Sequence, residues 1–244
     1  MNIVSWGGGT NSTAMIIGMY THEIPIDLIL FADAGGEYPH TYAYIDTMNH
    51  WLQDHGLPPI TRVYKTTRDG QRLTLEQECL QRGTLPSIVY GRKACSIKYK
   101  LEPQAKFCNR YAPCIEVWRH GGKVDRYIGY DAGETRRAYH AGKDKKYTNH
   151  YPLLEWGWSR KKCEEVIEAQ GLPLPYKSSC FFCPSSKKEE IRTLYTDHPD
   201  LFDRAVALER GARLTAIRGL GHTFSWADYI DSWLYGLETQ TRLF

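Results

Sequence analysis

Short apolar runs recur along the chain and predict buried strands. The runs are residues 2–5, 26–31, 60–66 and 126–130. Residues at helical spacing follow the first three runs and predict three helices. These helices are residues 11–20, 39–55 and 73–82. Because strands alternate with helices, the pattern predicts a doubly wound α/β fold, in which a parallel sheet carries helices on both faces.

The last third of the chain has a helical pattern. Ser159 is the expected N-cap of a helix that runs to Gln170, where Gly171 ends it. Ser225 is the expected N-cap of a later helix with an apolar face, which would pack against the sheet or against a second subunit. We therefore expect a first domain, residues 1–195, and a helical C-terminal extension packed on it, residues 196–244.

Composition narrows the classes of protein that fit. A chain of 244 residues with 42% hydrophobic residues can build a substantial core, and its net charge of +3 neither demands nor excludes a nucleic-acid partner. We find no apolar run of membrane-spanning length and no basic, apolar leader, so we expect a cytoplasmic protein with no membrane partner. Seven cysteines are an odd number, which favours thiols or metal ligands over a disulfide framework.

Three consecutive glycines lie between the first strand and the first helix. Gly7, Gly8 and Gly9 remove every β carbon from this turn, so the backbone can close over an anion and direct its N–H groups toward it. The alternative is an ordinary strand-to-helix turn in which Asn11 or Ser12 is the N-cap. Two other phosphate loops do not match, because no Lys-Ser/Thr pair follows the glycines and GxGxxG fits poorly.

Asp33 follows the second strand. Parallel strands end at the same edge of a doubly wound sheet, so Asp33 is expected beside the glycine turn. There it could accept a hydrogen bond from a nucleoside or hold Mg²⁺. The alternatives are an Asx turn or the cap of the next helix.

The cysteines offer a metal site. Cys180 and Cys183 form a CxxC pair that can bind one metal, and this pattern alone leaves zinc, a redox dithiol and an iron–sulfur cluster open. Basic residues surround Cys95 and would lower the pKa of its thiol, although a solvated helix start with a buried cysteine is the alternative. These basic residues are Arg92, Lys93, Lys98 and Lys100. Cys163 could be a fourth ligand; the remaining thiols are expected in the core, namely Cys79, Cys108 and Cys114.

Basic and aromatic residues also mix between residues 136 and 147. Such a stretch is either a solvated loop or a surface that follows a nucleic-acid backbone. Its members are Arg136, Arg137, Tyr139, His140, Lys143, Lys145, Lys146 and Tyr147.

Five ordered segments resemble the phosphoadenosine-phosphosulfate (PAPS) reductase family, which belongs to the adenine nucleotide α-hydrolase-like (PP-loop) proteins. Residues 5–13, SWGGGTNST, resemble the family's S-F-S-G-G-K-D-S-T, and residues 31–41 resemble D-T-G-x-x-x-P-E-T. Gly129, Ala132 and Glu134 match G-I-R-A-D-E-S-x-R, but Asp131 replaces the arginine. An acid at this position would repel a second phosphate or sulfate group. The other segments are P-L-x-x-W with its helix and the cysteine region.

The resemblance implies a mainly parallel five-stranded sheet, ATP and Mg²⁺ as cofactors, and a set of site residues. The implied nucleotide-binding residues are Ser5, Gly7, Gly8, Gly9, Thr10, Asn11, Ser12, Asp33, Gly35 and Glu134. The implied catalytic residues are Ser12, Asp33 and Arg136. Cys95, Cys180 and Cys183 look like the three ligands that hold a [4Fe–4S] cluster in tRNA-thiolating relatives.

These implications predict ATP-dependent sulfur transfer to a nucleobase or nucleic acid, with release of pyrophosphate and AMP. A sulfur donor and a tRNA or DNA acceptor would be the partners, and a homodimer is an open option. One alternative is reduction of adenylyl sulfate or PAPS, although no cysteine follows Cys183 to accept the sulfonyl group. Another is a non-catalytic nucleotide or nucleic-acid binding module with a structural zinc.

Overall fold

The computed structural model describes residues 1–91, 94–139 and 144–241, and its centre is one five-stranded sheet. All strand pairs are parallel, in the order β3-β2-β1-β4-β5. The strands are β1 (Asn2–Ser5), β2 (Leu28–Ala32), β3 (Ile60–Val63), β4 (Val124–Ile128) and β5 (Tyr147–His150). This arrangement confirms the expected fold class. The sequence pattern did not place β5, and it extended β3 three residues too far.

The chain divides into two compact units, each discontinuous in sequence. The first consists of Met1–Asp33, Glu37–Tyr64 and Leu101–Ser178 and contains the whole sheet. The second consists of Ala34–Gly36, Lys65–Lys100 and Ser179–Phe244. The single division at residue 195 stays a prediction.

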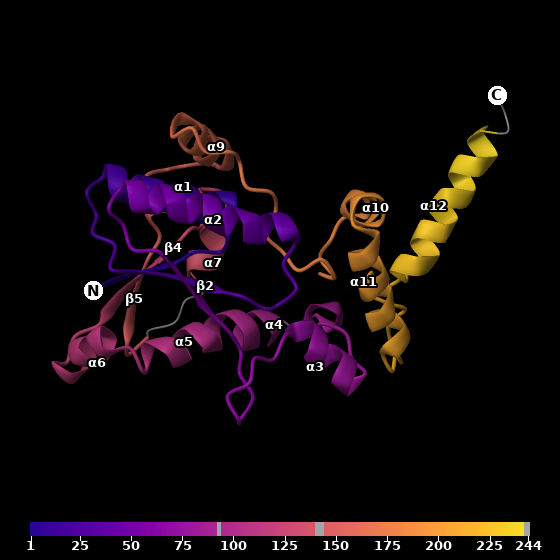
Figure 1. The fold of residues 1–244 in the computed structure, drawn as a ribbon, viewed down its shortest axis with the longest axis horizontal. Helices are drawn as coiled ribbons and strands as arrows, with labels where there is room; N and C mark the ends of the chain where they lie inside the picture. Colours follow the sequence, from indigo (N-terminus) through magenta and orange to yellow (C-terminus); the bar gives the residue numbers. More distant parts are fainter. Residues whose placement is uncertain (92–93, 140–143, 242–244) are drawn as a thin grey trace. The chain divides into compact units, whose positions relative to one another are not determined.

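Helices cover both faces of the sheet in the first unit (Figure 1). The larger layer consists of α1 (Thr10–Thr21), α2 (Pro39–Asp54), α8 (Pro152–Glu155) and α9 (Arg160–Ala169). The other layer consists of α5 (Glu102–Cys108) and α6 (Ala112–Arg119), and the short α7 (Thr135–Tyr139) follows β4. Ser159 Oγ accepts a hydrogen bond from the N–H of Lys162 at 3.3 Å, which confirms the expected cap of α9.

Alternate side chains of β1 and β2 supply the two halves of the core. Val4 and Phe31 pack toward α1 and α2, whereas Ile3 and Leu30 pack toward α5 and α6. This alternation is the two-residue period of a strand buried on both faces. Cys163 is buried in the first cluster, where burial raises the pKa of its thiol to about 12. Cys108 and Cys114 are buried in the second, as expected.

The strand order fixes where a ligand crevice can form. The chain winds from β1 through β2 to β3 on one side and then continues with β4 and β5 on the other. The winding therefore reverses between β1 and β4, and in open α/β sheets the carboxyl ends of the strands at this point form the binding crevice. The glycine turn follows β1, and Asp131 follows β4.

The second unit is mainly helical. Its longer helices are α3 (Leu75–Arg82), α10 (Lys188–Asp197), α11 (Pro199–Gly211) and α12 (Trp226–Thr241). Its short ones are η1 (Ser87–Tyr90), α4 (Ala94–Ser96) and most of η2 (Ile97–Leu101). Ser225 Oγ accepts from the N–H of Asp228 at 3.0 Å, so the expected cap of α12 is confirmed.

A buried carboxylate holds the loop between α11 and α12. Glu209 accepts hydrogen bonds from the N–H groups of Leu220 at 2.6 Å and Trp226 at 2.9 Å. Burial raises the pKa of its carboxyl, and these donors partly offset that effect.

No helix among the described residues is long and apolar enough to cross a membrane.

The packing of α1 against the indole rings gives a stability test. A β carbon on Gly18 would lie 2.4 Å from Cζ3 of Trp156, whereas one on Gly236 of α12 would meet no described atom within 4 Å. Alanine in a helix makes a protein more stable than glycine does by about 0.5–1 kcal/mol, but overpacking of the core lowers the stability by about 1–3 kcal/mol. We expect Gly18→Ala to lower the free energy of unfolding in urea and Gly236→Ala to raise it. Equal stabilisation by both would contradict this packing.

Candidate functional site

The glycine turn has a backbone shape that only glycine adopts easily. Gly8 lies in the left-handed region, with a φ of +77°, and a β carbon on it would lie 3.0 Å from Cγ2 of Thr41. Gly9 is the N-cap of α1 with an extended φ of −117°, which other residues can adopt. The turn therefore requires glycine at position 8 for both conformation and space.

Two hydroxyl groups hold the turn closed. Ser12 Oγ accepts from the N–H of Gly7 at 3.0 Å and donates to the carbonyl of Gly9 at 3.1 Å. Ser178 Oγ donates to the carbonyl of Gly7. Ser12, which the resemblance places among the binding and catalytic residues, thus braces the loop from inside. A direct role for it in catalysis stays a prediction.

Two helix N-termini meet at Gly8. Neither α1 nor α2 has a side-chain cap among the described residues, and neither has an acidic residue in its first turn. By contrast, α3, α9 and α12 are capped by Thr74, Ser159 and Ser225. Helix N-termini carry unsatisfied N–H groups and a partial positive charge. Their meeting at Gly8 favours an anion at this position.

Thr41 adds a buried hydroxyl at the same point. It lies in the first turn of α2, is 1% exposed, and its Oγ1 has no hydrogen-bond partner among the described residues. Buried hydroxyl groups are usually satisfied, so a donor without a partner beside an anion cradle suggests a ligand oxygen.

Asp33 lies at the edge of the sheet where the sequence placed it. It follows β2, is 3% exposed, and its Oδ1 accepts from Tyr42 Oη at 2.9 Å. Its own N–H donates to the carbonyl of Val63 at 2.9 Å. The N-cap of α2 is Tyr38, so the alternative of Asp33 as the helix cap is wrong.

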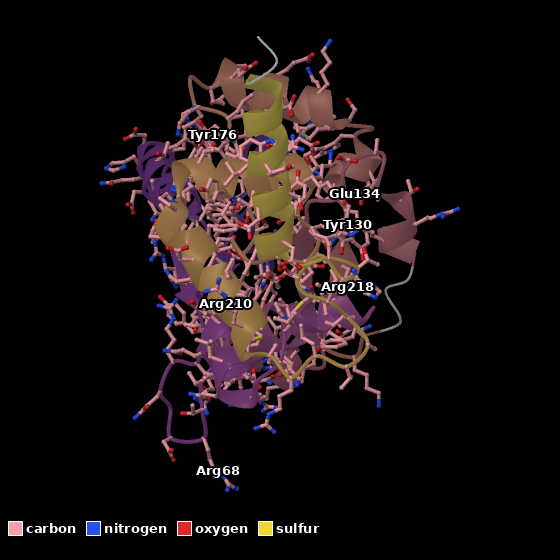
Figure 2. The ribbon with its side chains drawn as sticks, turned by 90° about the vertical axis from the view of Figure 1, so that its right-hand side faces the viewer. Arg68, Tyr130, Glu134, Tyr176, Arg210 and Arg218 are labelled. Atoms are coloured by element: carbon pink, nitrogen blue, oxygen red, sulfur yellow. The ribbon has the colours of Figure 1, made fainter. Side chains whose placement is uncertain are left out.

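Asn11 bridges two carboxylates beside the turn. Its Nδ2 donates to Asp131 Oδ2 at 3.0 Å and to Glu134 Oε2 at 3.1 Å. Glu134 also pairs with Arg137, whose guanidinium lies 4.3 Å from the ring centroid of Tyr130; both partners of Arg137 are labelled in Figure 2. A neutral amide can donate to both acids, whereas a third carboxylate would repel them.

The other predicted binding residues make contacts within the protein, and these contacts do not show whether the residues bind a ligand. Ser5 Oγ donates to Gln104 Oε1 at 2.7 Å, and Thr10 is 1% exposed. Gly35 belongs to the second unit, has a φ of +79°, and a β carbon on it would lie 2.3 Å from Cγ2 of Thr74. Arg136 lies exposed on α7. The binding and catalytic roles of these residues stay predictions.

Several described members of the basic stretch contact other residues of the first unit. Arg137 pairs with Glu134, as above, and the ammonium of Lys146 lies 4.3 Å from the ring centroid of Trp118. Tyr147 begins β5, so the stretch is not a single loop. His140 and Lys143 lie outside the described residues.

The predicted metal ligands all lie in the second unit. The N–H of Cys95 donates to Ser87 Oγ at 2.9 Å, and Cys95 lines a cavity of about 100 Å³ together with Cys79. The N–H of Cys183 donates to the carbonyl of Cys180 at 3.0 Å. Arg92 and Lys93 lie outside the described residues.

Cys79 is only 4% exposed, and burial raises the pKa of its thiol to about 12. Among the described residues, no group of three or more His, Cys, Asp or Glu side chains is placed to hold a metal ion. The assignment of Cys95, Cys180 and Cys183 stays a prediction.

Sequence reasoning did not assign a role to three residues that shape the site. Thr41 and Tyr42 come from the start of α2, and Ser178 comes from a segment far along the chain. Thr41 matches the last threonine of the family motif D-T-G-x-x-x-P-E-T, and this match was the one signal in the sequence for its place in the site. Ser178 begins the cysteine region, in which only the cysteines were assigned a role.

Comparison with known proteins shows a likeness to solved structures but no match at the level of sequence families. No protein-family model matches the sequence, and no curated protein matches it. Among solved structures, the chain is similar to the U34-tRNA thiolase NcsA from Methanococcus maripaludis with its [4Fe-4S] cluster. The sequence identity is 16%, the TM-score is 0.43, and the match covers 86% of this chain and 71% of that chain.

The hydrogen bonds from Asn11 to the two carboxylates can be tested by exchanging the amide and the acid between positions 11 and 131. We expect Asn11→Asp to destabilise the protein by about 1–2 kcal/mol at neutral pH, because a third carboxylate joins Asp131 and Glu134. Adding Asp131→Asn restores one amide between two acids and should recover most of the loss. Urea unfolding of the wild type, both single variants and the double variant measures the coupling. Additive effects of the two substitutions would contradict the bridge.

Proposed function

We propose that the chain binds the phosphates of an adenine nucleotide at the glycine turn and uses the nucleotide to activate an acceptor for sulfur transfer. One observation carries the proposal: two uncapped helix N-termini, those of α1 and α2, meet at Gly8. They do so beside the β1–β4 switch point, where doubly wound sheets bind nucleotides. The transfer of sulfur rests on the family resemblance.

The charges near the turn bear on which nucleotide fits. No lysine lies in the turn, so the backbone N–H groups supply its positive potential. Asp131 and Glu134 lie on the β4 side, where they would repel an additional phosphate or sulfate group. ATP therefore fits the proposed site better than PAPS does. Asp33 is the carboxylate that would hold Mg²⁺ against the phosphates.

The proposed reaction has two displacement steps. An oxygen of the acceptor attacks the α-phosphorus, the bond to the bridging oxygen of the β-phosphate breaks, and pyrophosphate leaves. A hydrosulfide donor then attacks the activated carbon, the carbon–oxygen bond breaks, and AMP leaves with that oxygen. Backbone N–H groups at Gly8 and Gly9 would stabilise the charge that grows on the phosphate oxygens. These two steps are written with free hydrosulfide as the sulfur donor; the resemblance assigns the holding of that sulfur to a cluster on Cys95, Cys180 and Cys183.

Gly9 allows a test that separates anion binding from folding. Gly9→Asp supplies an N-cap to α1 and should raise the stability of the protein by about 0.5–1 kcal/mol. It also places a carboxylate where the phosphate would bind, so we expect ATP affinity to fall at least about tenfold. Gly9→Asn is the matched control, because it caps the helix without charge and should weaken ATP binding less. Calorimetric titration with Mg²⁺–ATP and thermal unfolding give the two readouts.

The outcome of this comparison is decisive for the anion site. A Gly9→Asp variant that is more stable and still binds ATP like the wild type would place the phosphates elsewhere. A loss of affinity accompanied by a loss of stability in both variants would indicate a distorted turn.

Activity can be tested with α-labelled ATP. We expect the protein to release labelled AMP and pyrophosphate when a tRNA or DNA acceptor and hydrosulfide are present, and to release much less without the acceptor. Gly9→Asp should lower the rate at least about tenfold in parallel with its loss of affinity. If neither product forms with any acceptor while ATP still binds, the chain is a nucleotide-binding module and the transfer proposal is wrong.

A further inference from the structure

Three neighbouring aromatic rings lie in the first unit, on two segments that also contact the glycine turn. The ring centroids of Tyr38 and His40 are 5.0 Å apart with an interplanar angle of 11°. The ring of Tyr176 follows, 4.8 Å from that of His40 and tilted by 42°. We call Tyr38, His40 and Tyr176 the aromatic stack. The proposed nucleotide chemistry gives none of these rings a role.

Contacts with the turn place the stack at the rim of the candidate site. Ser178, two residues after Tyr176, donates to the carbonyl of Gly7 and approaches Glu37 Oε2 at 3.4 Å. Thr41, one residue after His40, would meet a β carbon on Gly8 at 3.0 Å. The two segments that carry the rings therefore both contact the turn, one through Thr41 next to His40 and the other through Ser178 two residues after Tyr176.

The outer ring, that of Tyr176, is exposed to solvent and lies on a stiff segment. Tyr176 is 73% exposed, and Figure 2 labels it. It follows the sequence Leu-Pro-Leu-Pro, whose two prolines fix their φ angles and stiffen the segment. An exposed aromatic ring on a stiff segment loses little conformational entropy when a ligand stacks on it. Lys177, also exposed, adds a positive charge beside it.

We propose that Tyr176, backed by His40 and Tyr38, stacks against a nucleobase of the acceptor strand. This inference rests on the proposed function and names the part of the chain that would hold the acceptor. Tyrosine rings are platforms for single-stranded nucleic acid, because every base has a π-face. An open ring at the rim admits a strand that enters and leaves, whereas a cofactor's adenine is usually enclosed in a pocket.

Binding of labelled oligonucleotides at fixed ionic strength tests the stack. The probes are a short oligothymidine, an oligouridine of equal length and an abasic sugar-phosphate oligomer of equal length and charge. We expect Tyr176→Ala to weaken binding of both base-bearing oligomers by about 5- to 150-fold. Binding of the abasic oligomer and of ATP should not change. Tyr176→Phe and Tyr176→Trp are matched controls that keep the ring and should bind like the wild type.

Three results would overturn the proposal. Equal weakening of the abasic oligomer would mean that the variant acts through charge or folding rather than through a base. Unchanged binding of every oligomer would mean that no base stacks on Tyr176. Weaker ATP binding with unchanged oligonucleotide binding would assign the ring to the cofactor's adenine.

The two proposals fail in different ways. If base-dependent binding through Tyr176 holds but α-labelled ATP is never consumed, the stack stands and the sulfur-transfer reaction is wrong. If ATP is consumed but Tyr176→Ala weakens all three oligomers equally or weakens none of them, the reaction stands and the stack is wrong. Because Tyr176 is largely exposed, the thermal stability of Tyr176→Ala should match that of the wild type, which checks its fold.

Discussion

The close approach of Gly8 to Thr41 is the constraint on which the candidate site depends. A β carbon at Gly8 would lie 3.0 Å from the threonine methyl group, and the backbone there has a φ that other residues rarely adopt. Only this absence of a side chain lets the starts of α1 and α2 meet. Ser12 then fixes the turn by bonding to both of its ends. The local positive potential thus follows from backbone packing and needs no basic residue in the turn.

The carboxylates that follow β4, those of Asp131 and Glu134, have the opposite sign to the positive potential at the turn. The family resemblance leads one to expect an acid at position 11 and an arginine at position 131, whereas this chain has Asn11 and Asp131. The amide of Asn11 donates to Asp131 and Glu134, as a neutral donor between two acids can. A phosphate that enters the crevice would meet N–H groups at the turn and carboxylates on the opposite side. That asymmetry limits how much anionic ligand the site can accept.

The sequence predicted the parts of the fold whose signals are local. Four strands and the caps at Ser159 and Ser225 depend on neighbouring residues, and all were found. The edge strand β5 was missed because only Tyr147 of its four residues is buried, which leaves no apolar run. Ser178 was missed for a different reason. Its bond to Gly7 joins residues 171 positions apart, and such tertiary contacts leave no periodic pattern.

The turn and the aromatic stack would hold their ligands by different forces, which explains how they can lie side by side. Phosphate binding at helix N-termini is electrostatic and weakens with salt, whereas stacking on a ring depends mainly on contact area. Ser178 connects the two, since its hydroxyl bonds to Gly7 while Tyr176 lies two residues earlier. A shift of that segment would therefore move the ring and the turn together. A base on Tyr176 and phosphates at Gly8 would then each favour the same position of the segment, which is the basis for coupling between acceptor and nucleotide.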